Sequence, residues 1–536
     1  MDYSQPALCL ALLHKLHPID FRATQETLAR MVEGLLEAKP APNQHLEVLE
    51  AARDTLSFAQ GELARSYCTH PLPPDQDENN DFGKVASLWQ AMARSYTRIA
   101  EADREAGTLN DQRALLAQRR LFYQGQVLVE HFRAHRSVVP GTWRALHAAY
   151  TSAVALGVAG IRVSEPLNPT WRAQSPQEAY IATLLVELAN PYGRNERELN
   201  WVMRWAQRFA PYCALDTQLD AQKPTAYGVD TASDTGLRPL GLLAHTPSLL
   251  RFDGSALATQ IQAMLAQFKR GVKPASLGLG SDCSTNASAR LLLSLYRPWG
   301  LASSGRRFPR RSKQGEIGLT GDWLGIGFAI KGELFQQPQT VAPKGRLRED
   351  ISLFTFGERV PLVESTEKAQ QRRESQALSL GFDLESWSIL DQSVGGFRLE
   401  SRTEVARLEH HQLVGIRPPD MNDVLIGDLS WLMYRADSTL EIGINILPGK
   451  PRVVAARQLA SASRTPFHQA FVLPATPALK APASIVLPSM WFQADRIIEV
   501  RDDDQVRQFQ LRKLMVRGTN YDQCSFEPVE SALNPT

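Results

Sequence analysis

Arginines dominate one short stretch of the chain. Between Cys283 and Gly315 no residue is acidic and seven are basic, namely Arg290, Arg297, Arg306, Arg307, Arg310, Arg311 and Lys313. Pro309 lies in the densest part and disfavours a helix, so we expect an extended or turning segment. Guanidinium is planar, permanently charged and forked, so it can bind phosphate through two hydrogen bonds, bind the O6/N7 edge of guanine, or stack on a base. The stretch fits a guanine nucleotide. A solvated basic loop or a nonspecific nucleic-acid patch would have the same composition.

A second pattern follows about 80 residues later in the chain. Residues 387–399 predict a strand, a polar turn and another strand, with Asp391, Ser393 and Gly396 close to the turn. Short Asp and Ser side chains hydrogen-bond readily at turns, and glycine permits close backbone approach. A carboxylate there can accept hydrogen bonds from the N1–H and N2–H2 groups of guanine. Taken alone, the pattern is also that of an ordinary hairpin.

Together the two patterns resemble the PilZ domain, the bacterial receptor module for cyclic di-GMP. That family carries Arg-x-x-x-Arg ahead of a six-stranded antiparallel barrel and Asp/Asn-x-Ser-x-x-Gly on an early strand. The first motif is matched twice, by Arg306 with Arg310 and by Arg307 with Arg311, and the second by Asp391-x-Ser393-x-x-Gly396. Residues 427–432 and 441–447 resemble later strands of the same barrel.

The resemblance implies a ligand and roles for these residues. The ligand would be cyclic di-GMP, and no other cofactor or metal is expected. Arg306, Arg307, Arg310 and Arg311 would contact its phosphates and stack on guanine. Asp391 and Ser393 would contact a guanine edge, and Gly396 would permit the turn.

The spacing between the two motifs departs from the family. The family usually has a few tens of residues there, and we attribute the excess to residues 336–379, a polar stretch that predicts a long, partly disordered insertion. The pair Arg372-Arg373 lies closer to Asp391 but has no second arginine four residues on. We therefore prefer Arg306–Arg311.

Other motifs carry less. Two glycine pairs, at 278–280 and 325–327, lack the remainder of a P-loop or a dinucleotide fingerprint and predict turns. His410 and His411 would point to opposite faces of a strand, which argues against joint metal binding. The Gly-Gly-Asp/Glu-Glu-Phe and Glu-Ala-Leu strings of the enzymes that make and degrade cyclic di-GMP do not occur. We therefore expect no enzyme.

The first 215 residues predict an all-helical scaffold. Long periodic segments cover 22–36, 84–106 and 109–134, and Ser175-Pro176-Gln177-Glu178 is a helix-starting capping box. Asn195 with Glu198 predicts another helix start. A bundle and an array of helical hairpins both fit, because no strict repeat appears. Residues 75–81 (DQDENND) are charged and follow prolines, so we interpret them as a solvated linker.

The rest of the chain predicts a multidomain α+β protein. Residues 216–300 mix strands and helices, and 301–450 carry the PilZ-like barrel with the insertion 336–379. Residues 451–536 predict a further β domain, with short apolar runs at 471–473 and 485–487.

Composition sets limits on class and location. Lys and Arg number 59 against 57 Asp and Glu, so the net charge of +2 gives no global case for nucleic acid. No apolar run approaches the roughly 20 residues of a membrane span. The start Met1-Asp2-Tyr3-Ser4 lacks the features of a signal peptide, and the five cysteines form no Cys-x-x-Cys pair. We expect a cytoplasmic protein with reduced thiols.

These observations favour a bacterial signalling protein that couples cyclic di-GMP binding to a protein partner, for which the helical half is the candidate binding surface. Two alternatives stay open. One is a ligand-independent interaction scaffold with a degenerate barrel. The other is a nucleic-acid-binding protein that uses the same arginines, whose binding would depend strongly on salt and little on Asp391 or Ser393.

Overall fold

The chain is described by a computed structural model covering residues 2–17, 19–217, 226–301, 311–312, 315–338, 366–401, 405–419, 421–459, 465–502 and 505–529. Contacts divide it into two compact units. The helical unit is residues 1–307 with 433–438, and the β unit is residues 308–432 with 439–536. The fourfold domain division expected from sequence stays a prediction. Among the described residues, no helix is long and apolar enough to cross a membrane.

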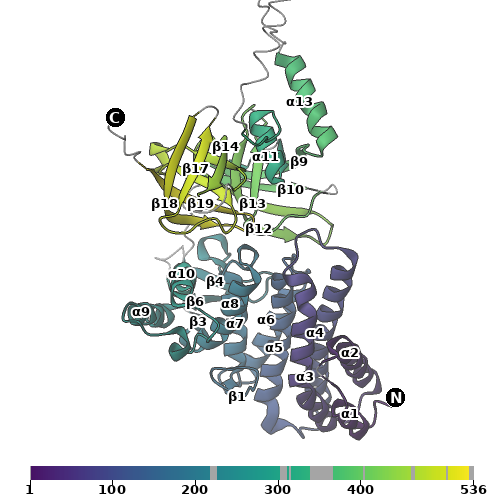
Figure 1. Cartoon of the computed structure of the whole chain (residues 1–536). Coiled ribbons are helices and arrows are strands. Elements are labelled where there is room, and N and C mark those ends of the chain that lie inside the picture. Colours follow the sequence, from purple (N-terminus) through teal and green to yellow (C-terminus); the bar gives the residue numbers. More distant parts are fainter. Residues whose placement is uncertain are drawn as a thin grey trace, which may run out of the picture. The chain divides into compact units, whose positions relative to one another are not determined.

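Helices make up most of the helical unit (Figure 1). They are α1 (Pro6–Leu13), α2 (Phe21–Ala38), α3 (Pro42–Cys68), α4 (Gln76–Ala102), α5 (Arg113–Arg133), α6 (Thr142–Ala155), α7 (Pro176–Leu188), α8 (Glu196–Phe209), α9 (Ser255–Lys269) and α10 (Thr285–Leu295).

Helix starts follow the capping signals in the sequence. The Ser175 hydroxyl accepts a hydrogen bond from the Glu178 amide, and the Glu178 carboxylate accepts one from the Ser175 amide, so the predicted capping box of α7 is confirmed. Asn195 caps α8 with one hydrogen bond, which its side chain accepts from the Glu198 amide. The interpretation of 75–81 as a linker was wrong. Asp75 and Glu78 form a complete capping box, α4 begins at Gln76, and Asp81 is a buried partner of Arg22.

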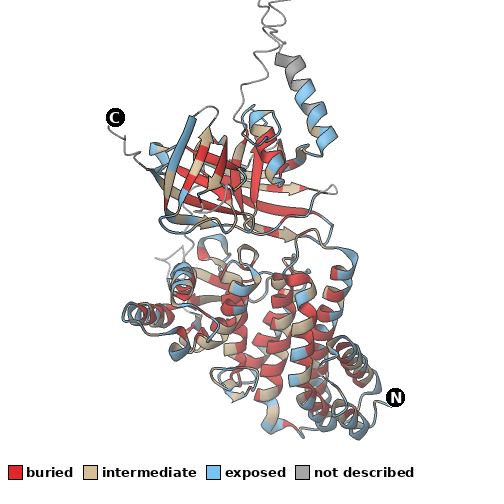
Figure 2. Cartoon of the chain, in the orientation of Figure 1, coloured by how far each residue is buried: buried red, intermediate tan, exposed pale blue. Residues whose placement is uncertain are grey.

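Each long helix packs on its neighbours in the chain. α2 packs on α3, α3 on α4, α4 on α5, and α5 on both α6 and α7. Figure 2 shows the result, with buried residues on the inner faces of α3, α4 and α5 and exposed ones outside. Amphipathic helices of this kind are stabilised mainly by burying one apolar stripe.

A small sheet completes the helical unit. Its order is β3 (Ala214–Asp216), β6 (Leu249–Asp253), β4 (Tyr227–Asp230) and β5 (Arg238–Pro239). A further two-stranded pair, β1 (Val163–Ser164) and β2 (Ala173–Gln174), lies in the loop before α7. Trp299, just after α10, is fully buried and donates from Nε1 to the Leu185 carbonyl of α7, so the C-terminal part of the unit is fixed to the helices.

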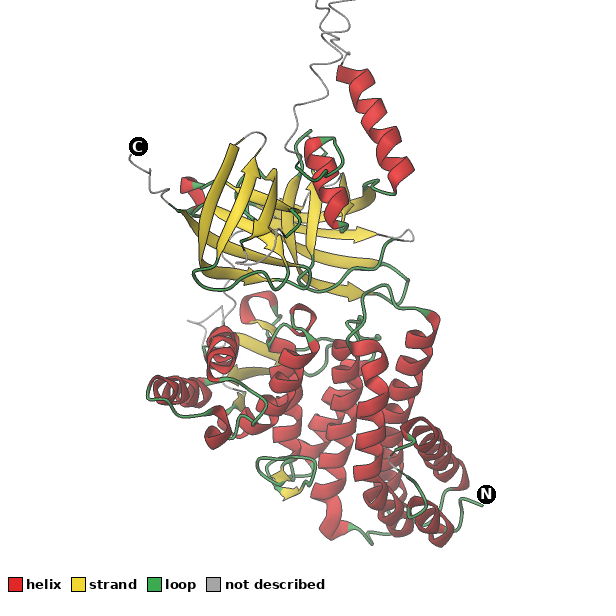
Figure 3. Cartoon of the chain, in the orientation of Figure 1, coloured by secondary structure: helices red, strands yellow, loops and turns green. Residues whose placement is uncertain are grey.

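The β unit begins with a closed barrel (Figure 3). Its strands are β8 (Glu316–Thr320), β9 (Glu385–Ser393), β10 (Gly396–Ser401), β11 (Leu413–Arg417), β12 (Leu425–Tyr434) and β13 (Leu440–Ile446). They pair in the cyclic order β8, β9, β10, β13, β12, β11, and β7 (Arg311–Ser312) adds to β9.

A second closed barrel follows. Its strands are β14 (Arg452–Gln458), β15 (His468–Leu473), β16 (Ser484–Pro488), β17 (Ile497–Asp502), β18 (Gln505–Arg517) and β19 (Tyr521–Pro528). The ring order is β14, β15, β16, β19, β18, β17. The predicted multidomain α+β fold with antiparallel barrels is thereby confirmed.

The two barrels share apolar contacts and a helix. α11 (Trp323–Lys331) supplies Ile326 to a buried cluster that also contains Leu413 of the first barrel and Phe471 of the second. Trp323 donates from Nε1 to the Gln469 carbonyl, and the Gln469 amide returns a hydrogen bond to the Trp323 carbonyl. Residues 366–380 form α13, so this part of the predicted insertion is helical (Figure 1). Residues 339–365 lie outside the described part.

Candidate ligand-binding site

The second sequence motif lies on one β-hairpin. Asp391 and Ser393 are on β9, and Gly396 begins β10 after the two-residue turn 394–395. Ser393 pairs with Gly396 and Asp391 with Arg398. The register shifts beyond Arg398, because Leu399 pairs with Ile389. This bulge re-aims the end of β9, as bulges often do beside functional sites.

Gly396 also allows β10 to lie close to β13, the strand on its other side. It pairs with Asn445 of β13, and a Cβ at this position would overlap the carbonyl oxygen of Ile444. Only glycine therefore fits without moving the backbone of β13.

The arginine stretch reaches this hairpin through β7. Arg311 pairs with Gln392, and Ser312 pairs with Asp391. The first motif thus ends beside the second, although some 80 residues separate them in sequence. Arg306, Arg307 and Arg310 lie outside the described residues, and their ligand contacts stay a prediction.

Asp391 lies in a small charged cluster. Its carboxylate is 3.7 Å from a guanidinium nitrogen of Arg398, and Arg398 Nε donates to Glu441 Oε1 at 2.6 Å. The Glu441 side chain, on β13, is 2% exposed, whereas the Arg398 side chain is 37% exposed. A buried carboxylate therefore holds a guanidinium that solvent can still reach. The hydrogen bond to Glu441 raises the pKa of Arg398, and the nearby Asp391 adds to the shift.

Sequence reasoning missed Arg398 and Glu441, yet half of the signal was available. A two-residue turn at 394–395 requires residue 391 to face residue 398, since paired residues lie symmetrically about the turn. Glu441 could not be found this way, because nothing in the sequence fixes the register of β13 against β10.

The competing pair, Arg372 and Arg373, is placed on α13. Both residues are exposed, and Arg373 lies beside Gly332 at the C-terminal end of α11. The β7–β9 pairing instead places Arg311, the last arginine of the preferred stretch, one residue from the partner of Asp391.

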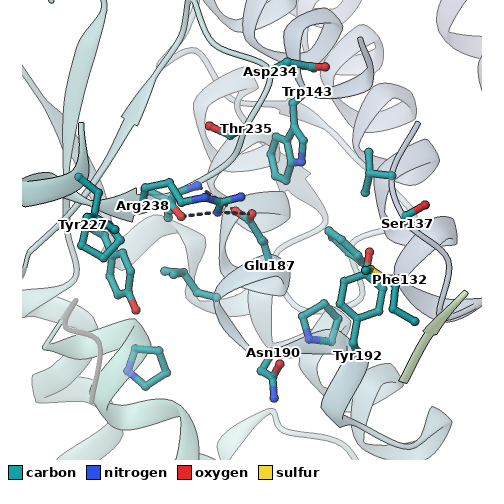
Figure 4. A pocket seen from close by; sticks show the side chains of 18 of the residues that line it. Phe132, Ser137, Trp143, Glu187, Asn190, Tyr192, Tyr227, Asp234, Thr235 and Arg238 are labelled. Carbon is teal, nitrogen blue, oxygen red and sulfur yellow. Dashed lines mark hydrogen bonds and ion pairs between the residues drawn. The ribbon is translucent and has the colours of Figure 1, made fainter. Parts of the chain in front are cut away.

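The helical unit contains a separate cavity of about 1190 Å³ (Figure 4). Four aromatic residues (Phe132, Trp143, Tyr192 and Tyr227) and four prolines (Pro140, Pro191, Pro239 and Pro298) line it. Glu187 also lines the cavity, and its carboxylate accepts hydrogen bonds from the Arg238 side chain and from the Leu237 amide, each at 2.9 Å. Burial raises the pKa of Glu187, and Arg238 opposes this.

The histidine pair is arranged differently from expectation. His410 and His411 precede β11 and do not lie on a strand, and their ring centroids are 3.9 Å apart. The strand-based argument against joint metal binding was therefore wrong in its geometry. His411 Nδ1 is 2.9 Å from Asp428 Oδ2, and His410 Nε2 is 3.1 Å from the Ser430 carbonyl oxygen. Among the described residues, no cluster of three His, Cys, Asp or Glu could hold a metal ion.

Comparison with known proteins adds a family likeness. Residues 7–221 match the family model "Cyclic-di-GMP receptor FimW, N-terminal domain". Residues 454–529 match the model "FimW C-terminal beta-barrel domain". Both ends of the chain are similar to FimW. The cyclic-di-GMP receptor FimW of Pseudomonas aeruginosa is 23% identical over 553 residues, which cover 95% of this chain and 89% of that protein.

The first barrel lies between the two matched ranges. The two family models match the helical scaffold and the second barrel, whereas the PilZ resemblance concerns the barrel between them. The 23% identity to FimW extends over 95% of the chain and so includes this middle barrel.

Proposed function

We propose that this protein is a cyclic di-GMP-binding signalling protein whose ligand site lies at β7, β9 and β10. The observation that supports the proposal is the pairing of β7 with β9, in which the last arginine of the stretch, Arg311, pairs with Gln392 and Ser312 pairs with Asp391. Similarity to a cyclic-di-GMP receptor over 95% of the chain supports the same ligand.

The chemistry of the site matches a guanine dinucleotide. Arginines supply bidentate contacts to phosphate and flat surfaces for a base, and charge-assisted hydrogen bonds of this kind are the stronger class. The Asp391 carboxylate offers two acceptor oxygens to the two donor groups on the guanine edge. Ser393 lies two residues away on the same strand, at the turn. The proposal includes no catalytic step, and the cytoplasmic location stays a prediction.

Calorimetric titration of the full chain with cyclic di-GMP tests this proposal. We expect micromolar or tighter binding that GTP does not mimic and that Asp391→Ala combined with Arg310→Ala abolishes. Arg372→Ala with Arg373→Ala is the control, because it removes two arginines from α13, outside the candidate site. Absence of heat and of any thermal shift at high ligand concentration would leave a ligand-independent scaffold as the better account. Equal losses in both double variants would indicate nonspecific attraction.

We further propose that the helical unit binds the protein partner through the cavity of Figure 4. Val139 and Leu242 at this cavity are 48% and 78% exposed. Aromatic-lined grooves take extended, proline-rich peptides in other recognition modules. Leu242→Asp should weaken capture of a partner found by affinity purification. Leu293→Asp should not, because Leu293 is also exposed, at 61%, but lies on α10 outside the cavity lining. Equal capture by both variants would place the partner elsewhere.

A further inference from the structure

Arg398 occupies a position that neither sequence motif includes. It lies on β10 opposite Asp391 and next to Leu399, a fully buried residue that points into the barrel. Successive residues of a strand point to opposite faces, so Arg398 and Glu400 project outward. Asp391 faces Arg398 across the hairpin and projects outward with it.

This outer face is crowded with carboxylates. Glu400 pairs with Glu441 across β10 and β13, and both Glu441 and Asp391 form ion pairs with the Arg398 guanidinium. A ligand that carries two phosphates would be repelled by such a group unless cations offset it. Arg398 is the described cation that touches both Asp391 and Glu441.

Glu441 restricts how Arg398 can lie. The Arg398 Nε donates to Glu441, and one terminal nitrogen of the same guanidinium lies 3.7 Å from the Asp391 carboxylate. A lysine has a single ammonium group and could not bond Glu441 and Asp391 with the same fixed geometry.

We propose that Arg398, held by Glu441, is a positioning residue that sets the base selectivity of the ligand site. This inference rests on the proposed function. Arg398, 3.7 Å from the Asp391 carboxylate, orients that carboxylate as a double acceptor. Guanine presents N1–H and N2–H2 donors to such a group. Adenine presents a bare N1 acceptor in the same place, which an ionised carboxylate repels.

The second barrel contains a matched control. Arg457 of β14 is paired with Glu499 of β17, and its guanidinium donates to that carboxylate at 2.9 Å. The Arg457 side chain is 23% exposed and its partner is 14% exposed. Arg457→Ala therefore removes a similar cross-strand ion pair far in sequence from the hairpin motif.

The test is calorimetric titration of the full chain with cyclic di-GMP and with cyclic di-AMP, for wild type, Arg398→Ala, Arg398→Lys, Glu441→Gln and Arg457→Ala. In Arg398→Ala we expect affinity for cyclic di-GMP to fall about tenfold or more, because Asp391 loses the neighbouring guanidinium that orients its carboxylate. We also expect the preference for cyclic di-GMP over cyclic di-AMP to fall by a similar factor. Lysine should restore part of the affinity and little of the preference. Glu441→Gln should lower the preference even though it removes a repelling charge, and Arg457→Ala should leave both quantities unchanged.

The outcomes separate this inference from the proposed function. No binding of cyclic di-GMP by the wild type would overturn both. Binding that Asp391→Ala abolishes, with an unchanged preference in Arg398→Ala, would overturn the role of Arg398 alone. Tighter binding with an unchanged preference in Glu441→Gln would show that Arg398 acts only through its charge. Thermal unfolding of every variant identifies any that fails to fold, and Arg398→Lys then decides the question.

Discussion

Glu165 is a fully buried carboxylate in the loop ahead of α7. It accepts hydrogen bonds from Arg53 at 2.7 Å, from Arg119 at 2.8 Å and from Gln118 at 3.0 Å. Arg53 lies on α3 and the other two on α5, so one side chain joins two helices to a loop. A network of this kind stabilises only while every member is satisfied.

Glu165→Ala should destabilise the helical unit strongly. Removing one partner of a buried ion pair costs about 3–5 kcal/mol, because the remaining charges stay buried without compensation. Urea unfolding followed by far-ultraviolet circular dichroism measures the loss. Glu62→Ala is the control, since its pair with Arg65 lies at the surface and should matter by less than about 1 kcal/mol. Similar midpoints for the two variants would contradict this account.

Gly396→Ala should destabilise the first barrel, because the added Cβ overlaps the Ile444 carbonyl oxygen. Overpacking of this kind costs about 1–3 kcal/mol. Gly61→Ala, on α3, has no atom within 4 Å of the new Cβ and should be neutral or more stable by up to about 1 kcal/mol. Differential scanning calorimetry distinguishes the two, and an unchanged barrel transition in Gly396→Ala would refute the prediction.

At this scale, sequence reasoning found residues with local signals. Ser175 and Asn195 were recognisable as caps because their partners lie three positions on. Asp75 carries the same signal with Glu78, but the acidic run around it was interpreted as solvated. Glu165, Arg53 and Arg119 were invisible, since residues so far apart in sequence meet only through helix packing.

A buried histidine on α3 makes the stability of the helical unit depend on pH. His45, in the first turns of α3, is 2% exposed, and its Nε2 has no hydrogen-bond partner in the described structure. Burial lowers the pKa of His45 to about 4, and Arg98 adds to the shift. In the unfolded chain this imidazole would titrate near 6.5.

The helical unit should therefore lose stability as the pH falls from about 6.5 to about 4. In that window the unfolded state binds a proton that the folded state refuses, so acid favours unfolding. The loss attributable to His45 is on the order of 2–3 kcal/mol. Unfolding of His45→Leu across the same pH range should show a flatter dependence than wild type. A parallel slope would mean that other groups, such as the buried His131 and His147, account for it.

Elements with strong periodicity could be predicted well. The run 316–320 is β8, and 440–444 begins β13, because alternating residues mark strands that bury one face. Register could not be predicted in the same way. The sequence shows that β9 and β10 form a hairpin, but the bulge at Leu399 depends on packing inside the barrel.

On the scale of the β unit, polar contacts join the two barrels. Tyr521 of β19 donates to Asp428 of β12 at 2.8 Å, and His411 contacts the same carboxylate. Asn520 accepts from the Leu413 amide at 2.9 Å. Burial raises the pKa of Tyr521 far above its usual range, so the hydroxyl keeps its proton and acts as the donor.

Tyr521→Phe should weaken the coupling between the barrels while each keeps its core. Loss of a hydrogen bond to a buried carboxylate costs about 1–3 kcal/mol. Calorimetry should show the β unit changing from one transition toward two. Tyr434→Phe serves as a control, because Tyr434 belongs to the helical unit and the substitution also removes one tyrosine hydroxyl. A single transition at the wild-type temperature would show that apolar contacts alone couple the barrels.

The fold class was predictable for the whole molecule, and the site only in part. Helical periodicity and short alternating runs separate the two halves of the chain without any structure. Ring closure, the shared core around Ile326 and the meeting of β7 with β9 arise from pairings between distant segments, which no local pattern specifies.

The chain passes between its two units more than once. It leaves the helical unit after Arg307, returns for residues 433–438 at the tip of β12 and β13, and leaves again. Tyr434 forms a bridge with Arg136, with backbone hydrogen bonds of 2.8 and 2.9 Å. Each unit is therefore built from two separate segments of the chain, so one cleavage of the backbone cannot separate them. A fragment starting after residue 307 would contain residues 433–438 but not Arg136, so Tyr434 would lose its bridge partner. Recombination that exchanged the receptor half for another would have to replace both pieces together, so the two units should be inherited as one module.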